Sequence, residues 1–148
     1  MSEFIERIKL VKGDITKQTG TDAIVAGVYP DMKLEGSLNA ALKEAAGTEL
    51  DKFIIEHIPK PMSGDAFATP PFNLPVWHII YVVQPRWRDG FYHEDVQQLR
   101  CFRSAMALAE RMKLKSIAFP ALGTGKKKFP VPRAARIALQ GIIDRASP

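Results

Sequence analysis

The sequence is poor in the residues that mark several specialised classes of protein. Cys101 is the only cysteine among 148 residues, so no disulfide can form within the chain. No apolar run approaches the roughly 18 residues that a membrane-spanning helix needs. The first residues also lack the apolar block of a signal peptide. We therefore expect a cytoplasmic protein without a membrane segment.

Histidine is also scarce, and the three histidines show no metal-ligand spacing. His78 lies in an apolar stretch, which is typical of a core histidine, and we expect Cys101 to be buried or half-buried beside Phe102. We expect Trp77 to pack against the predicted sheet. This pattern predicts no metal, no cofactor and no residue that can be named as catalytic.

The formal net charge is +5, and the positive excess lies late in the sequence. Residues 126–148 carry six basic residues and one acidic residue, whereas residues 1–60 carry eight basic and ten acidic residues. A local positive field favours an anionic partner such as a nucleotide or a nucleic acid. A solvated basic face explains the same pattern, so both interpretations stay open.

Strand and helix patterns alternate along the chain without a repeat, a low-complexity tract or a linker, so we predict a single domain over residues 1–148. The predicted strands are 5–14, 22–28, 64–70, 76–83 and 115–121. The predicted helices are 37–47, 48–57, 94–112 and one whose first turn contains Pro132. This order predicts an α/β layered fold with a largely parallel sheet.

The predicted helices have apolar faces and recognisable ends. Ser37 is a candidate N-cap of the first helix and Gly47 a candidate stop signal. In helix 94–112 the apolar residues recur at steps of three or four, as expected for an amphipathic helix: Val96, Leu99, Phe102, Met106 and Ala109. The last helix has a similar set: Ala135, Ile137, Ala138, Leu139 and Ile142.

Two loops, residues 26–37 and 121–130, follow predicted strands and precede helices. Ligands of α/β sheets bind beyond the carboxyl ends of the strands. A helix start adds unpaired N–H groups and the positive end of the helix dipole, which favour phosphate. Gly123 and Gly125 would let the backbone approach such an anion. Both loops are therefore candidate ligand-binding segments.

Five short motifs follow one another over nearly the whole chain: KGDIT, DAIV, AAG, NLP and SIAFPALGTG. Their order resembles that of a macro domain, the module that binds ADP-ribose. The resemblance implies a three-layer α/β/α fold with a mixed, largely parallel sheet. It implies that Asp14 accepts a hydrogen bond from the adenine amino group and that Ile15 packs beside the base. Without the family context, a turn or helix-cap aspartate is an alternative explanation of Asp14.

The other ligand-binding residues that the resemblance implies lie in the two loops. They are Gly36, Ser37, Leu38, Leu122, Gly123, Thr124, Gly125, Lys126, Lys127 and Phe129.

The sequence also departs from the family pattern. After DAIV the family usually has NAAN, but here residues 26–29 read AGVY, so Tyr29 replaces the asparagine that helps to hold the distal ribose. Asn39 stands where hydrolytic members often have an aspartate, and an amide cannot act as a base at neutral pH. Residues 126–128 are lysines where the family usually has an apolar residue, often an aromatic one, and another glycine. These departures predict a weakened site for the distal ribose and poor hydrolysis.

The family pattern continues beyond the last predicted helix with a further strand and helix. We therefore expect a fold that lacks this usual last strand and helix. The unpaired strand edge left in this way would favour a homo-oligomer.

The main hypothesis is a domain that binds ADP-ribose or a related adenine nucleotide, with weak or no hydrolase activity. One alternative is an ADP-ribosyl hydrolase or a deacetylase of O-acetyl-ADP-ribose. A second alternative is a nucleic-acid-binding domain, with Trp87 between Arg86 and Arg88 available for base stacking. Its basic patch would consist of Lys126, Lys127, Lys128, Arg133 and Arg136.

Overall fold

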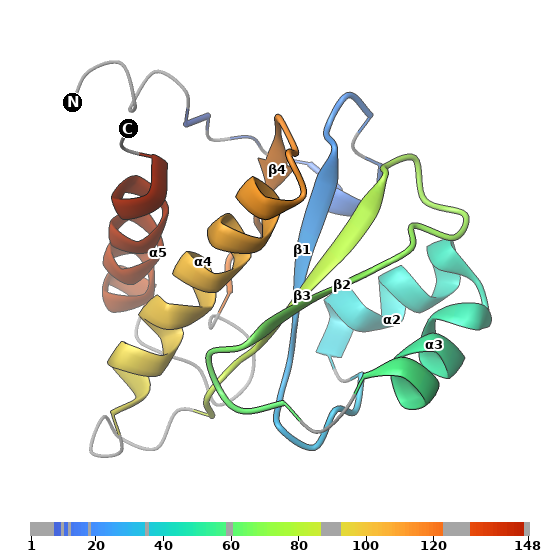
Figure 1. Ribbon diagram of the computed structural model, residues 1–148, viewed down its shortest axis with the longest axis horizontal. Coiled ribbons are helices and arrows are strands. Elements are labelled where there is room, and N and C mark those ends of the chain that lie inside the picture. The colour runs from blue at the N-terminus through green and yellow to red at the C-terminus, as the bar shows by residue number, and fades with distance from the viewer. Residues whose placement is uncertain are drawn as a thin grey trace.

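The computed structural model describes residues 8–9, 11, 13–17, 19–34, 36–58, 61–86, 93–122 and 131–146. Within this part of the chain four strands form one sheet in the order β2-β3-β1-β4 (Figure 1). The strands are β1 (Ala23–Val28), β2 (Ala66–Thr69), β3 (His78–Val83) and β4 (Ile117–Ala118). β1 pairs in parallel with β3 and β4, and β2 pairs antiparallel with β3. The mixed, largely parallel sheet is thus confirmed.

The helices lie on both faces of the sheet (Figure 1). They are η1 (Ile15–Lys17), α2 (Gly36–Ala46), α3 (Glu49–His57), α4 (Glu94–Arg111) and α5 (Val131–Ala146). α2 and α3 cover one face, and α4 and α5 cover the other. The three-layer α/β/α architecture is therefore confirmed. Within the described residues, no helix is both long and apolar enough to cross a membrane.

The alternation of side chains along β1 produces two hydrophobic cores. Ile24 faces the core formed with Leu42 of α2 and Leu50 of α3, whereas Val25 faces the core formed with Phe102 of α4. All five side chains are at most 1% exposed. Burying each of them stabilises the fold by about 1.5–3 kcal/mol. A strand buried on both faces reads as a continuous apolar run, which is why DAIVAGV is recognisable in the sequence.

The buried face of α4 differs from the predicted one. Val96 is 64% exposed, so its assignment to the apolar face was wrong. The buried positions are Glu94, Gln98, Cys101, Phe102, Ala105 and Ala109. They keep the predicted steps of three or four residues, but two polar side chains occupy the first turns. The burial predicted for Cys101 is confirmed.

In α5, Pro132 lies in the first turn as predicted. Ile137, Ala138 and Ile142 pack against the second core. Ala135 and Leu139 are exposed, so for these two residues the predicted packing was wrong.

The amino ends of the three parallel strands meet at Asp22. Its backbone carbonyl accepts hydrogen bonds from the N–H groups of Trp77 (2.9 Å) and His78 (3.2 Å) at the start of β3. Its carboxylate accepts one from the N–H of Lys115 (2.7 Å), and its own N–H donates to Ser116 Oγ (2.9 Å), just before β4. The Trp77 ring does not pack on the sheet as predicted, because the residue precedes β3 and is 71% exposed.

The structure also refines the predicted helix ends. α2 begins at Gly36, so Ser37 lies within its first turn and not at the N-cap. Gly47 adopts a φ of +100° and donates its N–H to the carbonyl of Lys43 (3.0 Å), which confirms it as the stop signal. Of the predicted strand 5–14, residues 5–7, 10 and 12 lie outside the described residues, and the described residues 8, 9, 11, 13 and 14 do not form a strand.

Candidate functional site

The segment that follows β1 at its carboxyl end forms a tight turn before α2. The N–H of Met32 donates to the carbonyl of Tyr29 (2.8 Å), and the N–H of Lys33 donates to the Asp31 carboxylate (3.1 Å). Met32 has a φ of +63°, a left-handed conformation that is uncommon for a residue with a side chain. These bonds shape the loop between β1 and α2, where the sequence places a ligand.

The start of α2 lies at the end of this loop. Gly36 has a φ of +89° and is exposed, as is Ser37, whereas Leu38 is half-buried and packs against the first core. The first turn of this eleven-residue helix lies near the carboxyl end of β1, because Asn39 donates to the carbonyl of Gly27, and its first N–H groups have no partner within the helix. This is the position at which a helix start can bind phosphate.

Asp14 precedes the short helix η1, which contacts α2. Its Oδ1 atom accepts hydrogen bonds from the backbone N–H of Thr16 (2.9 Å) and from the Thr16 hydroxyl (2.6 Å). These bonds lower the pKa of the Asp14 carboxyl below its ordinary value, the side-chain bond having the larger effect. Ile15 is half-buried and packs against the first core. Asp14 is thus a fixed, ionised acceptor at neutral pH.

Leu122 is buried at the end of the segment that follows β4. The other residues predicted for this loop, Gly123, Thr124, Gly125, Lys126, Lys127 and Phe129, lie outside the described residues, as does Lys128.

The predicted basic patch is altered by a salt bridge between α5 and α4. Arg133 donates from Nε to both carboxylate oxygens of Asp95 (2.9 and 2.8 Å), and its Nη2 donates to the same group. These hydrogen bonds raise the pKa of Arg133. Arg136 is exposed. Since the charge of Arg133 is compensated by Asp95, it adds little to a field for nucleic acid.

Asn39 binds the backbone beneath the candidate site. It is 3% exposed, and its Nδ2 donates to the carbonyl of Gly27 in β1 (2.8 Å). The side chain at the position of the expected aspartate therefore holds α2 against β1.

A pair of glutamines lies on the other side of Gly27. A Cβ atom added to Gly27 would lie 1.9 Å from Gln84 Nε2, so the missing side chain makes room for Gln84. Gln98 of α4 is fully buried and donates to Gln84 Oε1 (3.4 Å). The backbone N–H of Gln84 donates to the carbonyl of Val28 (2.7 Å). Sequence reasoning missed this arrangement, because only the register of β1 with β3 brings the residues together.

Tyr29 and Arg86 form a stacked pair at the same edge of the sheet. The guanidinium carbon of Arg86 lies 3.9 Å from the centre of the Tyr29 ring. Arg86 Nη2 lies 3.4 Å from Asp31 Oδ2. Tyr29 follows β1 directly and Arg86 follows β3, and these strands are paired with Val28 opposite Val83. The sequence suggested base stacking for Trp87 between Arg86 and Arg88, but not a contact of Arg86 with Tyr29. Trp87 and Arg88 lie outside the described residues.

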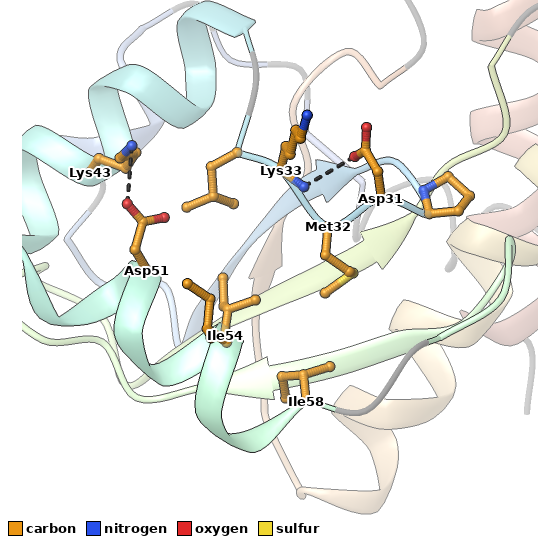
Figure 2. A pocket seen from close by; sticks show the side chains of 10 residues that line it. Asp31, Met32, Lys33, Lys43, Asp51, Ile54 and Ile58 are labelled. Atoms are coloured by element: carbon orange, nitrogen blue, oxygen red, sulfur yellow. Dashed lines mark hydrogen bonds and ion pairs between the residues drawn. The ribbon is translucent and has the colours of Figure 1, made fainter.

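Two grooves flank the loop between β1 and α2. The larger has a volume of about 750 Å³ and lies between the loop and α3. Figure 2 shows Met32 on the loop side, Ile54 on α3 and Ile58 just past the end of α3, with the Lys43–Asp51 ion pair (3.0 Å) at one end. The smaller groove has a volume of about 390 Å³ and is lined by Arg86 and Glu94 among others. Within the described residues no cluster of three potential metal ligands occurs.

Comparison with known proteins identifies the family. The model of the macro domain family matches residues 25–138. A macro domain-containing protein of Caldanaerobacter subterraneus is 36% identical over 142 residues, which cover 94% of this chain and 81% of that protein. A mutant macrodomain of Oceanobacillus iheyensis solved with ADPR is 33% identical, with a TM-score of 0.81 and coverage of 89% and 74% of the two chains. The Oceanobacillus iheyensis macrodomain with ADP is 35% identical, with a TM-score of 0.81 and coverage of 89% and 72%. The chain therefore belongs to the macro domain family.

Proposed function

We propose that this domain binds ADP-ribose or a related adenine nucleotide beyond the carboxyl ends of β1 and β4. The observation that carries the proposal is the close structural match to a macrodomain solved with ADPR and with ADP. The geometry of Asp14 supports it independently. A carboxylate that stays ionised and is held in place by Thr16 is a suitable acceptor for the adenine amino group.

The remaining predicted residues receive roles in the same proposal. Ile15 packs beside the adenine base, and Gly36, Ser37 and Leu38 present the start of α2 to the diphosphate. Leu122, Gly123, Thr124 and Gly125 approach the diphosphate from the second loop. Lys126 and Lys127 add positive charge, and Phe129 packs on the ligand or anchors the loop.

We further propose that the domain is a weak hydrolase or none. A hydrolase needs a group that orients water or accepts a proton near the distal ribose. At the expected position, Asn39 is buried, and its amide donates to the carbonyl of Gly27. Tyr29, at the other expected position, lies under the guanidinium of Arg86. Neither arrangement supplies a base.

The two remaining hypotheses are less well supported. The hypothesis of nucleic-acid binding relies on a patch of five cations, and one of them, Arg133, is already paired with Asp95 in a salt bridge. Neither the comparisons nor the described contacts give support to a homo-oligomer.

Calorimetric titration tests the binding proposal. We expect ADP-ribose to bind and Asp14→Asn to weaken binding by about 10- to 150-fold, because a hydrogen bond to a charged group contributes roughly 1.5–3 kcal/mol. Glu56→Gln, an exposed charge change on α3, is the matched control and should bind like the original protein. If folded protein gives no heat with ADP-ribose, ADP or AMP, the proposal is wrong.

A hydrolysis assay tests the second part. Release of ADP-ribose from a mono-ADP-ribosylated protein should be slow with the domain or no faster than without it. Efficient turnover would instead support the alternative of an ADP-ribosyl hydrolase, and the same assay with O-acetyl-ADP-ribose tests deacetylation.

A further inference from the structure

The smaller groove lies where an α/β sheet is expected to bind a ligand, yet none of its residues is among those assigned to ADP-ribose. It opens beyond the paired carboxyl ends of β1 and β3 and extends to the first turns of α4. Its volume of about 390 Å³ lies near the lower end of the range of small-molecule sites, roughly 300–1,000 Å³. We call it the Arg86 groove, after one of the residues that line it.

Arg86 presents a flat cation to this groove. One face of its guanidinium lies against the Tyr29 ring at 3.9 Å, and Asp31 holds the group by an ion pair at 3.4 Å. The side chain is still 39% exposed and lines the groove. A guanidinium whose orientation is already fixed loses little entropy when a second planar group stacks on it.

The other polar groups of the groove are mainly hydrogen-bond acceptors. Asp31 and Glu94 contribute carboxyl groups, and Glu94 is only 2% exposed. Gln97 adds an amide and Ser63 a hydroxyl group. Among the described residues that line the groove, two are acidic and one is a cation, so they favour a ligand that donates hydrogen bonds over a phosphate.

We propose that the Arg86 groove binds a nucleobase that carries an exocyclic amino group. The base stacks on the guanidinium of Arg86, as bases do on arginine planes in single-stranded nucleic acids. Its amino group donates to the carboxylate of Asp31 or Glu94, the pairing that carboxylates make with cytosine. This site is separate from Asp14, so the proposal does not depend on the binding of ADP-ribose.

The test is an NMR titration of the complete chain with cytidine and with uridine. These nucleosides have the same size and lack phosphate, but uridine has a carbonyl group where cytidine has the amino group. We expect cytidine to saturate and to shift the backbone amides of Asp31, Ser63 and Gln97. Uridine should bind at least about tenfold more weakly, because its carbonyl would face a carboxylate. This comparison needs no variant and is therefore independent of any effect on folding.

Variants then separate stacking from charge. Arg86→Lys keeps the charge but loses the plane, and we expect it to weaken cytidine binding by about 5- to 150-fold. Arg100→Ala, which removes an exposed arginine of α4, should leave cytidine binding unchanged, and so should Asp14→Asn. The proposal is refuted by equal affinity for the two nucleosides, by an Arg86→Lys variant that binds as tightly as the original protein, or by absence of saturation with cytidine. Shifts confined to η1 and the start of α2 would also refute it, since they would assign the nucleoside to the Asp14 end.

Discussion

The contact between Gly27 and Gln84 permits a quantitative prediction about stability. In the variant Gly27→Ala, the new Cβ would lie 1.9 Å from Gln84 Nε2 and 2.7 Å from its Cδ. Since these atoms form the far end of a flexible side chain, Gln84 can swing away and β1 can keep its place. The fully buried Gln98 then loses the hydrogen bond that it donates to Gln84.

The magnitude follows from that loss. Leaving a buried polar group without its partner costs about 1–3 kcal/mol. Replacing glycine by alanine restricts the unfolded chain and returns about 0.4–1 kcal/mol. We therefore expect Gly27→Ala to lower the free energy of unfolding by roughly 1–2 kcal/mol, measured by urea denaturation.

A double-mutant cycle identifies the cause. The single change Gln84→Ala also removes the hydrogen bond between Gln98 and Gln84. The double variant Gly27→Ala/Gln84→Ala loses this bond only once. The loss in free energy of unfolding of the double variant should therefore be about 1–2 kcal/mol smaller than the sum of the losses of the two single variants. Gln97→Ala, a neighbouring glutamine on α4, is the control and should be additive with Gly27→Ala. Strict additivity of the Gly27 and Gln84 changes would refute the reasoning.

Three further predictions concern single sites. Burial raises the pKa of the Cys101 thiol to about 12, so at pH 8 a thiol reagent should modify Cys101 only after the protein unfolds. Rapid modification of the folded protein would contradict this. The hydrogen bonds from Thr16 lower the pKa of Asp14 in the folded protein. The contribution of Asp14 to stability is therefore present above its unfolded pKa, near 4, and is lost as the pH falls through its pKa in the folded protein. NMR titration of the variant Thr16→Val should show a higher pKa for Asp14. A Cβ on Gly141 would lie 2.5 Å from Phe102 Cβ, so Gly141→Ala should separate α4 from α5 and cost roughly 1–3 kcal/mol in chemical denaturation, in spite of the better helix propensity of alanine.

The layers and element order could be predicted from the sequence because they rest on local patterns. β1 and β3 are continuous apolar runs, and Gly47 carries a stop signal that needs no tertiary information. The prediction failed where a neighbour decides the outcome. Val96 is apolar but exposed, since the buried face of α4 begins with Glu94 and Gln98. Trp77 is also exposed, since Asp22 binds its backbone while its ring lies in solvent.

The candidate site was predictable only in part, for a related reason. Asp14 and the start of α2 belong to short motifs that are visible in the sequence. The stack of Arg86 on Tyr29 and the packing of Gln84 on Gly27 each join residues more than 50 positions apart. Such contacts depend on the parallel register of β1 and β3, which no local pattern contains.

The position of Asp22 has a consequence for how this domain can change. Its hydrogen bonds align β1, β3 and β4 at their amino ends, whereas Tyr29, Arg86 and Leu122 leave the same strands at the opposite ends. Alignment of the strands is therefore secured far from the residues that would meet a ligand. Residues at the binding edge can be exchanged without disturbing that alignment, so selection can alter the ligand preference of the domain while its capacity to fold is preserved.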